Sequence, residues 1–323
     1  MPADIVAIIG AGSIGTAWAI AFADAGLAVK LYDVERSRLE AAKATVTERL
    51  SELTQHGLSR DGGSLRLSLH SDLAQALSTA THVQECAPED VSLKRQLFAE
   101  LDRLAPTDAV LASSSSFLPA SSFASDLAGC ARVLVLHPGN PPYLLRVAEV
   151  VPAPFTSEAT VTRTIDLLKR AGIEPVRLTR EIDGFVFNRL QGALLREAYA
   201  LVRDGIVTPG EIDRIVRDGL GLRWSLLGPF ETVHLNTRGG LRQHARRMGP
   251  AYWRMRRERG ENEEWSDALV NTVARDVEGR RPLADWEEHT AGRDRALMAL
   301  LEQRSHDTRL RALLDAPVAG DSP

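Results

Sequence analysis

A glycine-rich turn between an apolar run and an Ala-rich segment constrains the fold of this chain most. Residues 5–9 read Ile-Val-Ala-Ile-Ile, which is typical of a strand buried on both faces of a parallel sheet. Gly10, Gly12 and Gly15 follow in the spacing Gly-x-Gly-x-x-Gly, and a helical pattern then runs to Gly26. This order of strand, turn and helix predicts a dinucleotide-binding unit with the phosphates at the helix N-terminus.

An acidic residue stands where such a unit needs one. Asp33 ends the next expected strand, residues 28–33, and lies 23 positions after Gly10. A carboxylate at this place can bind the ribose hydroxyls of an adenosine and repels a 2′-phosphate, which favours NAD over NADP. Arg36 and Arg38 follow closely and weaken that preference. The alternative, a glycine turn that binds nothing, accounts less well for strand, helix and carboxylate together.

The pattern along the chain divides it into two parts. Further strands are expected at residues 82–86, 109–112 and 133–136, and helical patterns alternate with them, as parallel βαβ units require. Beyond residue 154 the pattern is helical apart from one weak strand at 174–178, and from Phe185 onward it is helical throughout. We expect a Rossmann-type doubly wound α/β sheet in residues 1–182 and an all-α C-terminal domain in residues 183–323.

Composition excludes several classes of protein. The 323 residues carry 39 basic and 43 acidic side chains, a net charge of −4, so the basic surplus of a nucleic-acid-binding protein is missing. No apolar stretch approaches 18 residues and the N-terminus lacks the pattern of a signal peptide, so we expect no membrane span. Two cysteines, Cys86 and Cys130, fit a reducing compartment such as the cytoplasm. We expect no metal site.

A histidine and a glutamate are the first candidates for catalysis. His137 follows the expected strand 133–136 and so lies at the carboxyl edge of the sheet, where ligands of such folds bind. It is either a general base or a structural turn histidine. Glu149 lies in the strand-like run 146–151 on an apolar face, where a carboxylate needs a partner, and the imidazole of His137 would supply one. Alternatively, Glu149 lies on an exposed edge strand and faces water.

Two further polar side chains are candidates for the same site. Ser116 ends the run 113–116 just after a strand, again at the carboxyl edge of the sheet. Asn188 lies at the start of the helical part among large apolar residues. Asparagine is a poor helix former with a polar side chain, so it caps, hydrogen-bonds or serves a site there.

These motifs make the chain similar to the 3-hydroxyacyl-CoA dehydrogenase superfamily. The resemblance rests on the glycine turn, on His-x-x-Asn-Pro at 137–141, on a Glu twelve residues after the His, and on Gly-Phe-Val-x-Asn-Arg at 184–189. Within the superfamily the chain is most similar to the lambda-crystallin group. That likeness continues through further runs at 137–143, 149–152, 204–207, 218–223 and 228–236.

The resemblance implies a role for each candidate. His137 and Glu149 would form a catalytic acid–base pair, and Ser116 and Asn188 would bind the reacting oxygen. The implied contacts with NAD are Gly10, Gly12, Ser13, Ile14, Gly15, Asp33, Glu89, Lys94 and Asn140. It also implies a homodimer formed through the helical domain. The implied activity interconverts a 3-hydroxy acid and its 3-keto acid, as an L-gulonate 3-dehydrogenase does.

The chain departs from the family pattern near the substrate. Gly139 replaces a larger apolar residue that is usual in the lambda-crystallin group, and Leu144 stands where an aromatic residue is common. The basic residues that bind the CoA tail in the family find no clear match among Lys43, Arg49 and Arg60. These departures put the shape of the substrate pocket and the use of CoA in doubt.

Three alternative functions remain. The first is a dehydrogenase or reductase of 3-hydroxyacyl-CoA, of another thioester or of a biosynthetic 3-keto acid. The second is the β-hydroxyacid dehydrogenase and imine reductase group, which relies on a lysine in the helical domain, whereas this chain has no Lys after Lys169. The third is a non-catalytic, crystallin-like structural protein, against which the intact set of four polar candidates argues.

Overall fold

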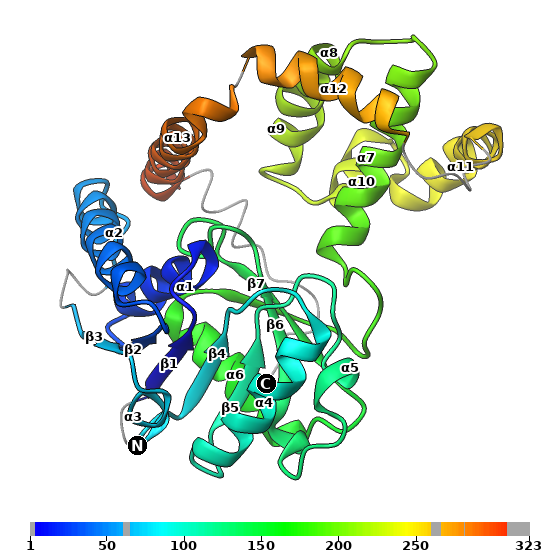
Figure 1. The fold of residues 1–323 in the computed structure, drawn as a ribbon. Helices are drawn as coiled ribbons and strands as arrows, with labels where there is room; N and C mark the ends of the chain where they lie inside the picture. Colours follow the sequence, from blue (N-terminus) through cyan, green and yellow to red (C-terminus); the bar gives the residue numbers. More distant parts are fainter. Residues whose placement is uncertain (1–3, 61–64, 260–265, 281, 309–323) are drawn as a thin grey trace. The chain divides into compact units, whose positions relative to one another are not determined.

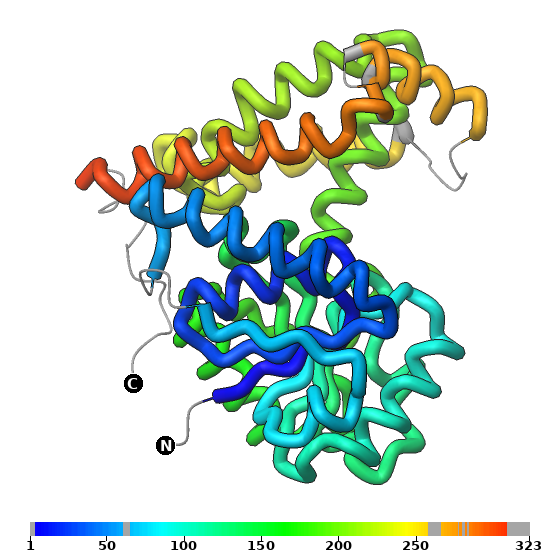
Figure 2. The backbone as a smooth tube through the Cα atoms, turned by 60° about the vertical axis from the view of Figure 1, so that its left-hand side comes forward, coloured from blue at the N-terminus to red at the C-terminus, as the bar shows by residue number. Residues whose placement is uncertain are grey.

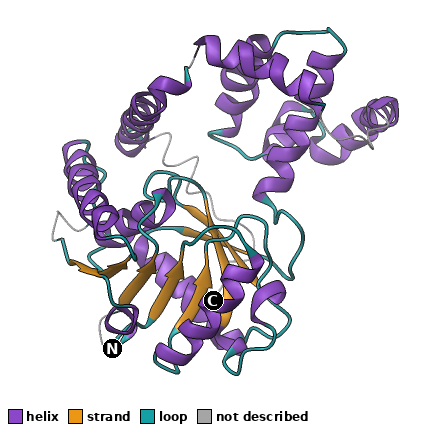
Figure 3. Cartoon of the chain, viewed as in Figure 1, coloured by secondary structure: helices purple, strands orange, loops and turns teal. Residues whose placement is uncertain are grey.

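The computed structural model describes residues 4–60, 65–259, 266–280 and 282–308. Apart from residues Leu297–Ala299, a first compact unit ends at Leu190, and a second begins at Gln191. All described strands belong to the first unit, and the described elements of the second are helices (Figure 3). The expected fold class, a Rossmann-type sheet followed by an all-α region, is confirmed.

The first unit is built on one twisted sheet (Figure 1). Its strands are β1 (Ile5–Ile9), β2 (Ala28–Tyr32), β3 (Leu67–His70), β4 (His82–Glu85), β5 (Val110–Ser113), β6 (Val133–Pro138), β7 (Val147–Pro152) and β8 (Glu174–Arg177). They lie in the order β3-β2-β1-β4-β5-β6-β7-β8, and every neighbouring pair is parallel except β6 and β7. The carboxyl ends of the parallel strands β1, β4, β5 and β6 therefore meet along one edge of the sheet.

Helices cover both faces of this sheet. They are α1 (Ser13–Asp24), α2 (Arg36–Gln55), α3 (Leu73–Leu77), α4 (Val91–Leu104), α5 (Ser121–Ala124) and α6 (Glu158–Ala171), with a short 3₁₀ turn at Cys130–Arg132. α1 packs beside α2 and contacts α6, whereas α4 contacts α3 and α5, so two helical layers form (Figures 1 and 2). The α2 helix buries Leu39, Ala42, Val46, Leu50 and Leu53, a spacing that keeps one apolar face.

The core lies between the sheet and these helices. Strand β1 is central, and its residues from Val6 to Ile9 are at most 2% exposed, which is why its sequence is apolar without alternation. On one face of the sheet, the strand residues pack with Phe98 and Leu101 of α4 and Phe123 of α5. The sheet and its core thus form a rigid base for the loops at its carboxyl edge.

The second unit contains helices of very different length. They are α7 (Phe187–Arg203, whose first turn belongs to the first unit), α8 (Pro209–Ile215), a π-helical turn (Val216–Gly221), α9 (Leu222–Trp224), α10 (Pro229–Asn236), α11 (Gly240–Arg259), α12 (Asp267–Arg280), a 3₁₀ turn (Leu283–Asp285) and α13 (Trp286–His306). Both α8 and α10 begin with a proline in the first turn and a glutamate that reaches back to the cap residue. No described helix is both long and apolar enough to cross a membrane.

One strand was not expected from the sequence. β3 (Leu67–His70) is short, carries alternating polar residues and pairs only with β2 at the edge of the sheet. Its four residues, Leu-Ser-Leu-His, give too weak a pattern to stand out from a loop. The weak strand expected at 174–178 is present as β8, which covers the outer side of β7.

Gly15 is the position in this base that tolerates a side chain least. A Cβ atom built on Gly15 would lie 1.9 Å from the carbonyl oxygen of Gly10, whereas one built on Gly12 meets nothing within 4 Å. We expect Gly15→Ala to lower the free energy of unfolding by about 1–3 kcal/mol or more, because the turn must open. Gly12→Ala should change it by less than about 1 kcal/mol. Urea unfolding of the two variants measures the difference, and equal stabilities would contradict it.

Candidate active site

The glycine turn presents the N-terminus of α1 at the carboxyl edge of the sheet. Gly12 is the cap residue of α1, no side chain caps the helix, and a Cβ at Gly12 would meet open space. The first N–H groups of a helix lack acceptors within it, and the helix dipole favours an anion there. Gly10 adopts a φ of +110°, and a Cβ there would lie 2.9 Å from the carbonyl oxygen of Cys86. This cradle fits the pyrophosphate of a dinucleotide.

Asp33 braces the same turn from β2. Asp33 is 6% exposed. The amide of Ala11 donates to Oδ2 at 2.8 Å, and the amide of Glu35 donates to Oδ1 at 2.9 Å. Each carboxylate oxygen has a second lone pair, so Asp33 can hold the turn and still accept from a ribose hydroxyl. Its contact with the cofactor remains a prediction.

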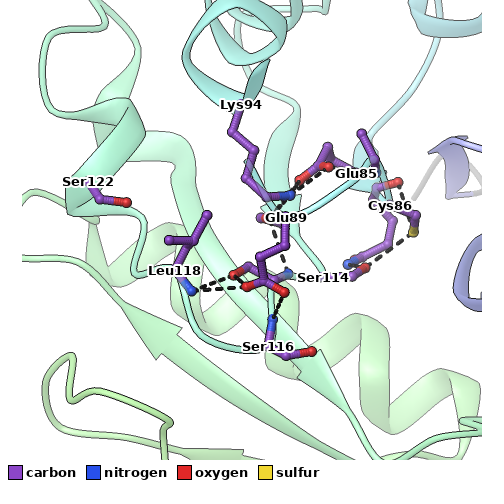
Figure 4. Close-up of polar contacts among 12 residues, drawn as sticks. Glu85, Cys86, Glu89, Lys94, Ser114, Ser116, Leu118 and Ser122 are labelled. Carbon is purple, nitrogen blue, oxygen red and sulfur yellow. Dashed lines mark hydrogen bonds and ion pairs between the residues drawn. The ribbon is translucent and has the colours of Figure 1, made fainter. Parts of the chain in front are cut away.

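A buried ion pair joins the ends of β4 and β5 to α4 (Figure 4). Nζ of Lys94 lies 2.8 Å from both carboxylate oxygens of Glu85, and the two residues are 1% and 0% exposed. The hydroxyl of Ser113 donates to Glu85 at 2.6 Å, as does the amide of Ala87 at 2.7 Å. Lys94 is one of four lysines in the chain, and its ammonium is committed to Glu85. Contact of Lys94 with the cofactor stays a prediction.

Glu89 holds the loop that follows β5. Its carboxylate accepts from the Ser115 hydroxyl and from the amides of Ser116, Phe117 and Leu118, at 3.3, 2.7 and 3.1 Å (Figure 4). Burial raises the pKa of Glu89, but these donors outweigh it and hold that pKa below its ordinary value. Glu89 therefore fixes the backbone on which Ser116 stands.

A thiol and a hydroxyl lie beside this network. Ser114 Oγ accepts from Gln84 Nε2 at 2.7 Å and from Trp18 Nε1 at 3.1 Å, and it lies 3.2 Å from Sγ of Cys86. Burial raises the pKa of Cys86 to about 12, so the thiol stays protonated. A protonated thiol is a weak nucleophile at neutral pH.

His137 and Glu149 face each other across the antiparallel pair β6 and β7. They are register partners, and Nδ1 of His137 lies 2.7 Å from Oε2 of Glu149. The two residues are 7% and 5% exposed. Burial raises the pKa of Glu149, but the bond to His137 and the amides of Val186 and Phe187 hold it below its ordinary value. Because the carboxylate is ionised, Nδ1 carries the proton and Nε2 is the nitrogen that can exchange one.

The remaining candidate, Asn188, reaches the same loop as Glu89. Its Nδ2 donates to the backbone oxygen of Ser116 at 2.8 Å from the first turn of α7. The structure thus brings Asn188 and Ser116 together, and the amide keeps a second N–H for another acceptor.

A pocket of about 190 Å³ collects six of the predicted residues, although neither Glu149 nor Asn188 lines it. Its lining residues are Ile14, Cys86, Ala87, Glu89, Lys94, Ser114, Ser115, Ser116, His137, Pro138 and Asn140. It joins the start of α1 to the His137 imidazole, so a group bound at the helix N-terminus can reach the catalytic candidates. From the sequence alone, Glu85, Ser113 and Ser115 were not identified as part of this network. The available signal was that all three are polar residues at the ends of two adjacent strands. No group of described residues could hold a metal ion.

Comparisons with known proteins assign both parts of the chain to one family. Residues 5–182 match the NAD-binding domain of 3-hydroxyacyl-CoA dehydrogenase, and residues 184–274 match its C-terminal domain. A lambda-crystallin homolog of Bos taurus is 43% identical over 306 residues, which is 92% of this chain and 94% of that protein. An L-carnitine dehydrogenase of Pseudomonas sp is 35% identical over 300 residues, 92% of each chain.

The structure is also similar to a solved one. A 5-formyl-3-hydroxy-2-methylpyridine 4-carboxylic acid 5-dehydrogenase, an NAD+-dependent dismutase, matches with a TM-score of 0.82 at 26% identity. The match covers 94% of this chain and 99% of that one. The likeness therefore extends over both units.

The Glu85–Lys94 pair should contribute strongly to stability. Lys94→Met leaves the Glu85 carboxylate buried without its counter-ion, so we expect a loss of about 3–5 kcal/mol in the free energy of unfolding. Combining Lys94→Met with Glu85→Gln removes the unpaired charge and should recover much of that loss. Denaturant unfolding of the three proteins measures both effects, and wild-type stability in the single variant would contradict the prediction.

Proposed function

This chain belongs to the 3-hydroxyacyl-CoA dehydrogenase family, whose members are NAD-dependent oxidoreductases, and we propose that it interconverts a 3-hydroxy acid and its 3-keto acid. The buried contact of 2.7 Å between His137 and Glu149 is the observation that carries the proposal. It lies at the carboxyl edge of the sheet, and His137 lines the pocket that also contains Ile14 of the glycine turn. An acid–base group and a dinucleotide cradle are the two parts that alcohol oxidation requires.

The four polar candidates then divide proton transfer and oxygen binding between them. Bound NAD would supply the hydride acceptor for the oxidation, and bound NADH the hydride donor for the reduction. In the oxidation, Nε2 of His137 takes the hydroxyl proton, and the ionised Glu149 stabilises the imidazolium. Ser116 and the second N–H of Asn188 hold the oxygen as it becomes a carbonyl. In the reduction, the same donors polarise the ketone and His137 returns the proton.

We favour a free acid, such as L-gulonate, over an acyl thioester as substrate. Among the basic residues considered for a CoA tail, Arg49 forms an ion pair with Glu52, and the side chains of this pair are 12% and 19% exposed. Arg49 is therefore not presented as a free cation for a nucleotide phosphate.

A substrate screen that follows NADH formation tests this proposal. The compounds are L-gulonate and other 3-hydroxy acids, L-carnitine, and 3-hydroxyacyl thioesters. Turnover of free acids but not of thioesters supports the proposal, and preferred turnover of thioesters overturns the free-acid part. No turnover with any of them favours a binding or structural protein.

Removing either member of the acid–base pair should reduce turnover and leave the cofactor site intact. We expect His137→Gln and Glu149→Gln each to lower kcat by about 10²–10⁴-fold, the usual contribution of a positioned acid–base group. NADH affinity, measured by fluorescence titration, should remain within twofold or so of the wild type as the control. Near-normal kcat in either variant would sink the assignment.

We propose further that the protein is a homodimer that pairs through its helical unit. Among the described residues from 191 on that belong to this unit, only Ala200, Thr232 and Asp294 are buried. Large apolar side chains there are exposed instead, including Ile206, Leu222, Trp224, Phe230, Leu235, Trp253 and Trp286. So much exposed apolar surface is typical of an interface.

Light scattering measures the oligomeric state directly. We expect twice the chain mass of 35.3 kDa, and Phe230→Asp should shift the protein toward the monomer because a charge desolvated in an interface is costly. Val34→Asp, at a similarly exposed apolar residue of the first unit, is the matched control and should leave the mass unchanged. A monomeric wild-type protein at micromolar concentration would refute the dimer.

We also propose that the protein works in the cytoplasm. Cys86 and Cys130 are free thiols, as the reducing cytoplasm favours.

A further inference from the structure

We infer that the turn at Gly184 and Phe185 is a positioning device for the His137–Glu149 pair. Its left-handed backbone aims the first amides of α7 at the Glu149 carboxylate and fixes that carboxylate for the imidazole. The catalytic consequence of this inference rests on the proposed function, whereas the hydrogen-bond geometry does not.

The backbone of this turn is unusual. Gly184 has a φ of +70° and Phe185 a φ of +50°, and among the described residues Phe185 is the non-glycine residue with a positive φ. A large L side chain rarely adopts this conformation, and surrounding contacts must hold it there. Phe185 is fully buried, and its ring centroid lies 5.6 Å from that of His137. The packing that stabilises the strained residue therefore involves the catalytic candidate itself.

The turn delivers two amides to one carboxylate oxygen. The N–H groups of Val186 and Phe187 donate to Oε1 of Glu149 at 2.7 and 3.1 Å, while Oε2 accepts from His137. These amides stand at the start of α7, where backbone N–H groups lack partners within the helix and the dipole is positive. Both oxygens of Glu149 are thus held, and rotation of the carboxylate would break bonds on each side.

The next residue extends this grip to the oxygen-binding loop. Asn188 donates to the backbone oxygen of Ser116 at 2.8 Å, and a Cβ built on Gly184 would lie 3.8 Å from the ring of Phe117. One segment of five residues, 184–188, therefore ties together the loop after β5, His137 on β6 and Glu149 on β7. A change in its backbone should move the acid–base pair and the loop of Ser116 at the same time.

Gly184→Ala tests this inference because it alters the backbone with little crowding. A Cβ on Gly184 meets its nearest neighbour, Cβ of Asn188, at 3.6 Å, which is ordinary contact. Gly57→Ala is the matched control in the same unit, since Gly57 has a φ of +66° and a Cβ there meets nothing within 4 Å. We expect similar falls in Tm for both variants. We expect kcat to fall about tenfold or more only in Gly184→Ala, with unchanged NADH affinity.

A double-mutant cycle separates positioning from general damage. If Gly184 acts through Glu149, Gly184→Ala should lower kcat less than about twofold in a Glu149→Gln background, because the group it positions is already lost. The inference would be wrong if the two substitutions lowered kcat by independent factors, so that the double variant showed their product. It would also be wrong if Gly184→Ala and Gly57→Ala had equal kcat values. Should Gly184→Ala fail to fold, Gly184→Asn replaces it, because asparagine tolerates the left-handed conformation better.

A spectroscopic measurement tests the geometry without any substrate. In protein labelled with ¹⁵N-histidine, the Nδ1 proton of His137 should give a hydrogen-bonded resonance, assigned by its absence in His137→Gln. We expect this resonance to shift or broaden in Gly184→Ala and to stay unchanged in Gly57→Ala; an unchanged resonance in both overturns the inference. An inactive wild-type protein with the expected resonances refutes the proposed function and leaves the positioning role standing.

Discussion

The site depends on one buried carboxylate that is shared between two partners. Glu149 lies among apolar residues, where an ionised group without donors would be strongly destabilising. It is stabilised by His137 on one oxygen and by the amides of Val186 and Phe187, at the start of α7, on the other. The same bonds that make its burial tolerable also orient the imidazole and anchor the start of the first long helix beyond the sheet. One set of contacts therefore stabilises the buried carboxylate and fixes the geometry of the proposed acid–base pair.

The strand order explains how this contact arises. β6 and β7 are the antiparallel pair in an otherwise parallel sheet, so the chain returns beside itself and places residue 149 opposite residue 137. β8 then covers the far side of β7, which removes Glu149 from the edge of the sheet. A parallel connection could not have brought two residues twelve positions apart into register, because it needs a crossover of a dozen or more residues.

A second set of charges supports the facing side of the pocket. Glu85 and Lys94 neutralise each other inside the core, and Glu89 binds the amides of the loop after β5 (Figure 4). Residue type alone could not distinguish Glu89 and Lys94 from a solvated helix start. The burial of Glu85 and Lys94 follows from the meeting of β4, β5 and α4, which are distant in sequence. Ser116 is positioned by this network from one side and by Asn188 from the other.

The amino-acid sequence by itself determined the dinucleotide unit, the change from α/β to all-α structure and the identity of the polar candidates, because local patterns and short spacings encode them. It left open whether Glu149 faced water or His137, and it gave no sign of the edge strand β3 or of the left-handed Phe185. Those points depend on which strand covers which edge and on which ring packs against the turn. Only the tertiary structure decided them, because the free energy of a buried charge or a strained backbone is set by neighbours that are distant in sequence.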